Sequence, residues 1–405
     1  MNIQAPKGTK DILPGESYKW EHIMNIACAV CKQFGFSEIR TPVFEDTALF
    51  ERGIGDSTDI VQKEMYTFLD KGGRSITLKP EGTAGVVRAY IEHSLFADGG
   101  PTKLFYFTPC YRYDKPQAGR YREHHQFGVE LFGSEHAIAE GEVISLLLGF
   151  LTKMGISNLK VNLNSIGCWV CKPDYNKALK AYFADKDICE LCDSRLEKNP
   201  MRVFDCKADI CKEVVKDAPK TIDCLCDACQ NHMNNLKEIL SQSGINYVVD
   251  SSIVRGQDYY TRTVFEISFG AGSQEVICGG GRYDGLVEQM GGKPTPAIGF
   301  GLGIERLLLA LEKSGVEIPD EEAPDIFIGY IGEGADIAAF NLARKYRAEG
   351  KKVILEIQGR SPKAQMKYAN KIGAKFSCII GEDEITQRAF ALKNMQTGEE
   401  EINKL

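Results

Sequence analysis

Two arginines border a polar loop between two β-prone segments, and they are the first groups in the sequence that suggest chemistry. Arg112 and Arg120 stand at either end of the Pro- and Gly-containing loop 114–120. A guanidinium offers paired N–H donors, so two of them can clamp phosphate oxygens. Gln126 and Glu130 follow at alternate positions, which places them on one sheet face. The pattern predicts a site for a polar, phosphate-bearing ligand; the alternative is cross-strand ion pairing on a solvated face.

Glycine-rich segments carry further candidate groups. In the turn 77–85, Glu81 and Thr83 are placed to hold an ammonium group, and the alternative is an ordinary helix start with Thr83 as N-cap. The glycine run 279–281 suits a ligand lying flat against a strand, or else a bulge. At 299–306, glycines open an apolar helix bearing an arginine, with a spacing that is not a dinucleotide-binding fingerprint.

Cysteine is unusually frequent, with 14 residues in the chain. Most of them fall in one segment, in closely spaced pairs with one extra residue: Cys168, Cys171, Cys189, Cys192, Cys206, Cys211, Cys224, Cys226 and Cys229. Repeated pairs suit a tetrahedral zinc thiolate site, and plain burial is the alternative. A disulfide framework is not expected in a reducing compartment. Any zinc here would be structural and not catalytic.

Composition limits the class of protein. The 405 residues are 43% apolar and 26% charged, which is ordinary for a globular chain of two or three domains. No apolar run approaches the ~20 residues that span a bilayer, and the start lacks a signal-peptide core, so we expect a cytoplasmic protein without a membrane segment. The net charge of −7 gives no general attraction for nucleic acid, so any RNA contact must be local.

The spacing of apolar residues predicts the helices and strands that position these groups. In the first part of the chain it predicts helices at 17–34, 138–154 and 304–311, and strands at 36–41, 104–113, 125–132, 159–163, 247–249, 264–269 and 275–278. We therefore expect a domain at 1–320 built on antiparallel strands, interrupted by a cysteine-rich helical insertion at about 168–240. After a linker, strands at 325–331, 352–357 and 376–380 alternate with helices at 335–348 and 361–372, which predicts an α/β domain at 325–405 with a largely parallel sheet.

The order of these motifs resembles that of class II aminoacyl-tRNA synthetases. Pro42 after the first helix resembles motif 1, the hairpin resembles motif 2, and the glycine-rich strand with the Arg306 helix resembles motif 3. More narrowly, the chain resembles the histidyl-tRNA synthetase family in the segments 7–14, 79–85, 119–122, 254–260 and 280–285. The resemblance spans almost the whole chain. It implies an α+β fold in which an antiparallel sheet flanked by helices carries the helical insertion, followed by an α/β anticodon-binding domain.

The resemblance also implies an activity and its residues. The family activates L-histidine with ATP and Mg²⁺ to histidyl-adenylate, releases pyrophosphate, charges the 3′ end of tRNA(His), and works as a homodimer. Arg112 and Arg255 would be catalytic, on either side of the α-phosphate. Residues implied to hold histidine are Glu81, Thr83, Arg112, Gln126, Glu130, Arg255, Tyr259, Tyr260 and Tyr283. Those implied for ATP are Arg112, Asp114, Arg120, His124 and Arg306, and those for the tRNA acceptor end are Lys115 and Gln117.

Glu130 fits its implied role. It stands between Val129 and Leu131 in an otherwise apolar strand, where a carboxylate without a partner is costly. A carboxylate that accepts from the imidazole N–H, with a tyrosine on the other ring nitrogen, would reject amino acids that leave either group unpaired.

Three positions depart from the family pattern. Asp114 stands where the class usually has Glu, His124 where Phe stacks on adenine, and Lys115 where Arg is more usual. We expect an altered nucleotide geometry and weaker discrimination at the acceptor end, because lysine lacks the bidentate fork. In the last domain, ten basic residues against two acidic ones between Asn341 and Lys375 predict an anticodon-stem surface; the alternative is a merely solvated face.

Two other functions compete with the ligase. The first is the histidine-sensing regulatory subunit of ATP phosphoribosyltransferase, a synthetase paralogue; such paralogues commonly lack the anticodon domain and some ligand residues. The second is a zinc-dependent nucleic-acid binder with a degenerate catalytic core. The complete residue set and the extra domain favour the ligase.

Overall fold

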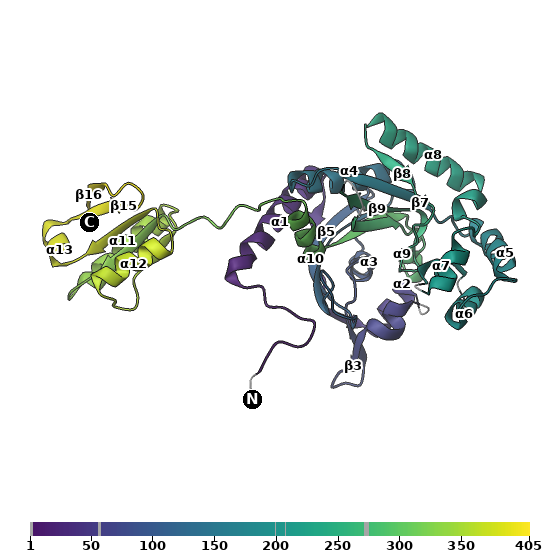
Figure 1. Cartoon of the computed structure of the whole chain (residues 1–405), viewed down its shortest axis with the longest axis horizontal. Coiled ribbons are helices and arrows are strands. Elements are labelled where there is room, and N and C mark those ends of the chain that lie inside the picture. Colours follow the sequence, from purple (N-terminus) through teal and green to yellow (C-terminus); the bar gives the residue numbers. More distant parts are fainter. Residues whose placement is uncertain (1–2, 56–57, 199, 207, 271–274) are drawn as a thin grey trace. The chain divides into compact units, whose positions relative to one another are not determined.

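The computed structural model describes residues 3–55, 58–198, 200–206, 208–270 and 275–405. It forms two compact units, Met1–Ile318 and Pro319–Leu405, each of which has its own sheet (Figure 1). Among the described residues, no helix combines the length and the apolar character that crossing a bilayer requires.

An eight-stranded sheet organises the first unit. Its strand order is β1-β5-β6-β11-β10-β9-β7-β8. Neighbouring strands from β5 to β7 run antiparallel, while β1 and β8 pair in parallel at the two edges. The strands, in sheet order, are Ser37–Glu38, Thr102–Tyr111, Glu123–Phe132, Ala297–Gly303, Glu275–Arg282, Thr261–Phe269, Lys160–Ser165 and Tyr247–Val249. The predicted antiparallel hairpin is therefore confirmed as β5 and β6.

Four helices cover one face of this sheet: α1 (Pro14–Gln33), α4 (Ile138–Lys153), α8 (Asp227–Gln242) and α10 (Ile304–Lys313). In α1 the residues Ile23, Ala27 and Val30 recur at helical spacing and are buried. They join Phe105 and Phe127 of the hairpin in the largest apolar core. Removing this much apolar surface from water is what holds the helices to the sheet.

The opposite face of the sheet carries the polar groups of the hairpin. Because strand side chains alternate, Tyr106, Gln126 and Glu130 point away from the main core. This face is partly covered by α3 (Thr83–Glu92) and the short α9 (Leu286–Gln289), which form a second apolar core with Tyr106. The result is a half-covered face on which polar side chains meet an open space.

The segment between the first helix and α3 forms a small structure that the periodicity did not predict. A three-stranded antiparallel sheet, in the order β2-β4-β3, consists of Phe44–Asp46, Ser75–Leu78 and Tyr66–Leu69. Helix α2 (Thr47–Ile54) and a π-helical turn, Ile60–Glu64, complete it. Strands this short and largely exposed leave too little alternation to be read from the sequence.

The cysteine-rich insertion is helical, as its composition predicted. It contains α5 (Cys171–Phe183), α6 (Glu190–Lys198) and α7 (Asp209–Val215), with the 3₁₀ turns Pro200–Asp205 and Thr221–Cys224, and leads into α8 (Figure 1). It has a small core of its own.

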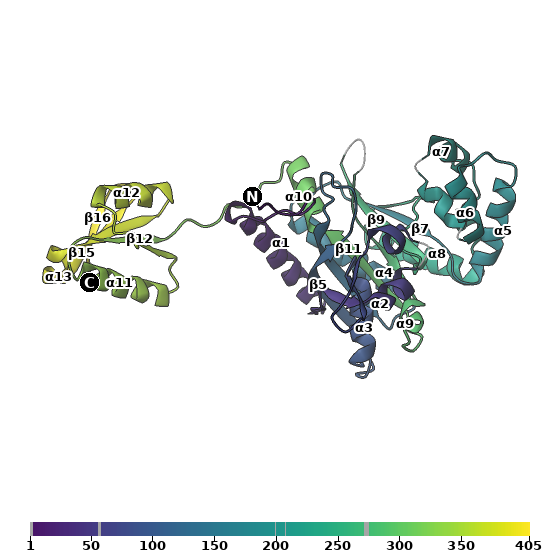
Figure 2. The ribbon, with the colours of Figure 1, turned by 90° about the horizontal axis from the view of Figure 1, so that it is seen from below.

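The second unit is a five-stranded sheet in the order β13-β12-β14-β15-β16, with the strands Val353–Leu355, Ile326–Tyr330, Phe376–Ile380, Ala389–Asn394 and Glu400–Lys404. Helices α11 (Ala335–Ala348) and α12 (Pro362–Lys371) lie on opposite faces of it, and α13 (Glu382–Gln387) precedes β15 (Figure 2). The expected parallel order holds for β13, β12 and β14. The antiparallel β15 and β16 were missed, because β16 is polar and mostly exposed and has no apolar alternation.

Candidate active site

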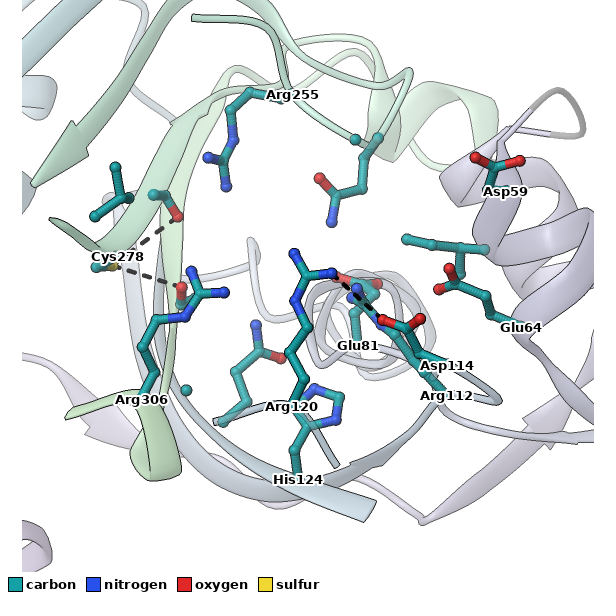
Figure 3. A pocket seen from close by; sticks show the side chains of 18 of the residues that line it. Asp59, Glu64, Glu81, Arg112, Asp114, Arg120, His124, Arg255, Cys278 and Arg306 are labelled. Atoms are coloured by element: carbon teal, nitrogen blue, oxygen red, sulfur yellow. Dashed lines mark hydrogen bonds and ion pairs between the residues drawn. The ribbon is translucent and has the colours of Figure 1, made fainter. Parts of the chain in front are cut away.

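A cavity of about 470 Å³ opens on the half-covered face of the large sheet. Figure 3 shows Arg255 and Arg306 at one side and Arg112, Arg120 and His124 projecting from the hairpin. The predicted site residues that line the cavity are Glu81, Thr83, Arg112, Asp114, Arg120, His124, Gln126, Arg255, Tyr259, Tyr260 and Arg306. In the described part of the chain, Glu130 and Tyr283 lie buried outside this lining, and Lys115 and Gln117 also lie outside it.

Arg112 and Arg120 of the hairpin are held in different ways. Arg112 continues the strand ladder, since its N–H donates to the carbonyl of Arg122 at 2.9 Å. Its Nε donates to the carbonyl of Pro80 at 2.7 Å, which leaves the terminal nitrogens to face the cavity. Arg120 makes a longer contact with Asp114, at 3.5 Å between Nη1 and Oδ2, and its side chain is 47% exposed. One guanidinium is therefore fixed by the fold, while the other extends across the cavity (Figure 3).

Arg255 lies flat against a glycine of β10. Its Nη1 donates to Glu266 at 2.8 Å, and its Nε is buried without a partner among the described residues. A Cβ at Gly279 would lie 2.1 Å from Nη1, and a Cβ at Gly281 would lie 2.9 Å from the Tyr260 ring. The glycine run thus makes room for the chain's own side chains, which corrects the expectation that a ligand lies directly on it. An unpaired buried donor costs about 1–3 kcal/mol, so the described residues leave the hydrogen-bonding capacity of Nε unused.

The cavity is also cationic where Arg306 enters it. Burial and the nearby charge of Arg120 lower the pKa of Arg306 below its ordinary value. Like charges held together in a buried place favour an anion between them. The arrangement of Arg112, Arg120, Arg255 and Arg306 can therefore hold several phosphate oxygens.

Glu130 has its own buried pocket of tyrosines. Its side chain is 1% exposed and accepts hydrogen bonds from Tyr283 and, at 3.1 Å, from Tyr106. Burial raises the pKa of Glu130 to about 8. A Cβ at Gly299, opposite it on β11, would lie 2.0 Å from the carboxylate, so the glycine creates the space. Tyr259 stacks at a tilt on Tyr260 and edge-on to Tyr283, which links this pocket to the cavity wall.

The start of α3 supplies the remaining polar groups. The Glu81 carboxylate accepts from the N–H groups of Thr83 at 3.0 Å and Ala84 at 2.7 Å. The Gln126 Oε1 accepts from the N–H of Gly82 at 2.9 Å. The N-cap residue is Gly82 and the capping oxygens come from Glu81, so the alternative with Thr83 as N-cap is wrong. Burial raises the pKa of Glu81, and a cation bound here would oppose that rise.

His124 presents a neutral ring to the cavity. Burial, with the charge of Arg112 as a further cause, lowers its pKa to about 3. The next residue, His125, is held by Glu305, which accepts from its backbone N–H at 2.9 Å and lies 3.0 Å from Nδ1. That contact ties the hairpin to α10 and fixes the strand from which His124 projects.

The sequence model described as Histidyl-tRNA synthetase matches residues 8–307, and the one described as Anticodon binding domain matches residues 325–404. The chain belongs to the histidyl-tRNA synthetase family. It is 56% identical over 403 residues to the histidine–tRNA ligase of Caldanaerobacter subterraneus subsp. tengcongensis, covering 99% of this chain and 97% of that protein. Identity to the histidine–tRNA ligase of Clostridium perfringens strain ATCC 13124 is 52%, over 99% and 96% of the two chains.

Solved structures of the family share the fold. The apo histidyl-tRNA synthetase of S. aureus aligns with a TM-score of 0.85 at 40% identity, covering 100% of this chain and 97% of the other. A Bacillus halodurans protein, titled an ATP phosphoribosyltransferase regulatory subunit/histidyl-tRNA synthetase, aligns with a TM-score of 0.66 at 24% identity, over 94% and 98% of the chains. The second likeness shows the fold alone. The predicted family and fold class are confirmed.

Sequence reasoning missed several charged groups that this histidyl-tRNA synthetase fold brings to the cavity. They are Asp59, Glu64, Arg195, Arg202, Glu266 and Glu305. Glu266 carried a readable signal, because it is a lone carboxylate in the mostly apolar strand β9, as Glu130 is in β6. Arg195 and Arg202 come from the insertion, and only the fold shows that they reach the cavity.

Proposed function

We propose that this cavity activates L-histidine with ATP and that the chain then transfers histidine to the 3′ end of tRNA(His), as a histidine–tRNA ligase. The observation that carries the proposal is that two chemically different binding regions adjoin each other. The tyrosine-lined pocket of Glu130 suits an imidazole, and it adjoins a cavity whose arginines suit a triphosphate. Few ligand pairs other than histidine and a nucleotide satisfy both.

Histidine is proposed to bind at three points. Glu81 and Gln126, with Thr83, take the ammonium group at the start of α3. Glu130 accepts from the imidazole N–H, with Tyr260, Tyr259 and Tyr283 around the ring. A side chain without a ring donor would not give the buried Glu130 the further hydrogen bond that an imidazole N–H supplies, which lowers binding energy and gives specificity.

The first reaction forms one bond and breaks another at the α-phosphate. A carboxylate oxygen of histidine attacks phosphorus, and the bond to the β-phosphate bridging oxygen breaks, which releases pyrophosphate. Arg112 and Arg255 are proposed to stabilise the charge that builds on the α-phosphoryl oxygens, and their place in the cavity lining supports that assignment. Arg120 and Arg306 hold the β and γ phosphates, and His124 stacks on adenine beside Asp114.

The second reaction moves the histidyl group to RNA. The terminal 3′ hydroxyl attacks the mixed anhydride carbonyl, and AMP leaves. Lys115 and Gln117 on the hairpin loop are proposed to contact the acceptor end, which suits their place outside the cavity lining. The unit from 325 to 405 is proposed to bind the anticodon stem through its basic residues.

Magnesium fits the cavity as a companion of ATP. No group of three carboxylates gathers among the described residues, so the chain offers no preformed magnesium cage. Mg²⁺ commonly uses one or two carboxylates together with substrate phosphates, and Glu266 and Glu305 line the cavity. When bound, the ion neutralises phosphate charge. Structural zinc in the insertion is also proposed; none of the insertion's described cysteines lines the cavity, so zinc takes no part in the chemistry.

The assembly is proposed to be a homodimer of chains with a catalytic domain at 1–320, its insertion at 168–240 and an anticodon domain at 325–405, acting in the cytoplasm. The small sheet exposes apolar side chains, with Phe44 58% and Leu69 70% exposed. Their exposure supports burial of this surface by the second subunit of the dimer. Sedimentation of the purified chain tests the dimer.

Histidine-dependent exchange of labelled pyrophosphate into ATP tests the activity. We expect exchange with histidine and not with glutamine or phenylalanine. Failure of exchange in pure protein with Mg²⁺ would overturn the proposal. The rival regulatory subunit is not favoured, because the chain carries the anticodon-binding domain and matches curated ligases over its full length.

A further inference from the structure

The insertion gathers its scattered cysteines into two separate groups of four. One group joins the first and last pairs, Cys168, Cys171, Cys226 and Cys229, and the other joins the middle pairs, Cys189, Cys192, Cys206 and Cys211. Within each group the sulfur atoms all lie within 4.8 Å of one another. We propose that the insertion binds two zinc ions, one in each group. The inference does not depend on the proposed ligase activity.

The sulfur spacing fits one ion at the centre of each group. A Zn–S bond of about 2.3 Å in a tetrahedron places its sulfur ligands about 3.8 Å apart. The Cys168 sulfur lies 3.8 Å from those of Cys171 and Cys226, and the Cys189 sulfur lies 3.7 Å from that of Cys206. These distances are far longer than the ~2.05 Å of a disulfide. A cluster of several irons would hold its thiolates farther apart than a single ion does.

Chain topology shows why these are two sites and not one. The base site, as we name the group of Cys168, Cys171, Cys226 and Cys229, closes a long loop: it joins the turn after β7 to the start of α8. The inner site, the group of Cys189, Cys192, Cys206 and Cys211, is nested within that loop around the start of α6 and α7. Cys224 belongs to neither group.

Backbone N–H groups point at the sulfurs, which is a second observation in favour of thiolates. The N–H of Val170 donates to Cys168 at 3.4 Å, and that of Cys226 donates to Cys171 at 3.2 Å. In the inner site, the N–H of Cys189 donates to Cys211 at 3.3 Å. Four thiolates around a divalent ion leave net negative charge, and N–H donors offset it.

The metal has a structural task in this place. The insertion's own core is small, with Tyr175, Leu179, Phe183 and Val203 among its apolar members. A module of this size gains much of its folding free energy from a bound metal. Between the inner-site pairs, Arg202 donates to the carbonyl of Gly256 at 2.9 Å and to Asp258 at 2.8 Å. The inner site thus fixes the arginine that supports the loop before Tyr259 and Tyr260.

Metal analysis of the full chain tests the stoichiometry. After expression and purification without added zinc, elemental analysis by mass spectrometry should give two zinc atoms per chain. A mercurial thiol reagent should release both, as read with a chromogenic chelator. One zinc, none, or iron in place of zinc would overturn the proposal.

Paired substitutions test the ligand sets. Cys168→Ser with Cys226→Ser should leave one zinc per chain, and Cys189→Ser with Cys206→Ser should also leave one. Cys224→Ser is the matched control and should keep two. A control that loses zinc, or a paired variant that keeps two, contradicts the assignment. If a paired variant does not fold, cobalt substitution of the unaltered chain decides: two cobalt ions with intense thiolate charge-transfer bands support the proposal, and weak bands overturn it.

Discussion

The hydroxyl of Tyr283 donates a hydrogen bond to the carboxylate of Glu130 across the sheet, in a pocket that excludes water. Glu130 lies in β6 and Tyr283 directly follows β10, and Gly299 of the intervening strand β11 leaves space for the carboxylate. Burial raises the pKa of Glu130 to about 8, because the buried pocket disfavours the charged form of this carboxyl. A buried acid poised in this way is costly to keep and points to a ligand.

Glu130→Gln should abolish most of the response to histidine. The amide keeps the shape but cannot act as an anionic acceptor for the imidazole N–H. We expect histidine-dependent pyrophosphate exchange to fall roughly 100-fold in kcat/KM, equivalent to about 3 kcal/mol, with the KM for ATP unchanged. Steady-state exchange measures both. The exposed Glu135→Gln is the matched control, and near-normal activity of Glu130→Gln would refute the role of Glu130.

The same substitution should stabilise the free protein at alkaline pH. The folded-state pKa of Glu130 is raised from an ordinary value of 4.5, so its contribution to stability is complete below about pH 4.5 and is lost as pH rises through about 8. Glutamine does not titrate and escapes this loss. The melting temperature of Glu130→Gln minus that of the unaltered chain should therefore grow from pH 5 to pH 9. A difference that shrinks with pH would contradict the raised pKa.

Arg255→Ala should remove adenylate formation while sparing ATP binding. In its proposed role, the charge of Arg255 acts where the α-phosphoryl oxygens become more negative, so its loss should raise the free energy of the transition state. We expect kcat for exchange to fall roughly 1000-fold and the dissociation constant of ATP to change little. Arg255→Lys keeps the charge that balances Glu266 and serves as the control for folding. Near-normal adenylation by Arg255→Ala would show that Arg255 does not act on the α-phosphate.

His124→Phe should keep the KM for ATP, whereas His124→Ala should raise it roughly 10-fold, because a stacked ring contributes about 1–3 kcal/mol. The pKa of His124 lies at about 3, so the ring stays neutral from pH 5 to pH 9. The KM for ATP should therefore not change near pH 6.5 because of His124, and its pH profile should be the same in the unaltered chain and in His124→Phe. A change near pH 6.5 that the unaltered chain shows and His124→Phe lacks would mean that the ring becomes charged and contacts phosphate.

Local patterns predicted the hairpin well because its strands are long and alternate. Glu130 was predicted as functional because a carboxylate in an apolar strand conflicts with its surroundings. By contrast, the grouping of the first cysteine pair with the last depends on where β7 and α8 meet, which no spacing reveals. Arg202 was missed for the same reason, since its partners Gly256 and Asp258 are remote in sequence. Local sequence patterns could not predict these contacts, because tertiary packing brings the residues together.

Arg282 shows how a residue inside a recognised motif can be structural. It lies in the segment 280–285 but is fully buried on the core side, where its guanidinium donates to Glu140 at 2.7 and 2.5 Å. His232 lies 2.6 Å from the same carboxylate and is itself buried. The pair joins β10 to α4, so it supports the sheet from behind the site.

Breaking that pair should destabilise the fold without changing substrate specificity. Burial alone would raise the pKa of Glu140, but hydrogen bonds from Arg282 and His232 outweigh it and hold the pKa at about 2. Glu140→Gln removes the closer of the two carboxylate partners of the buried Arg282 and leaves Asp284, at 3.1 Å, as the other. Breaking a buried ion pair costs about 3–5 kcal/mol. Because the folded pKa is depressed from 4.5, the stabilisation is present above about pH 4.5 and is lost as pH falls through about 2. Urea unfolding from pH 7 to pH 3 should therefore show the two proteins converging in free energy of unfolding toward acid, and a constant difference would refute the ion pair as its source.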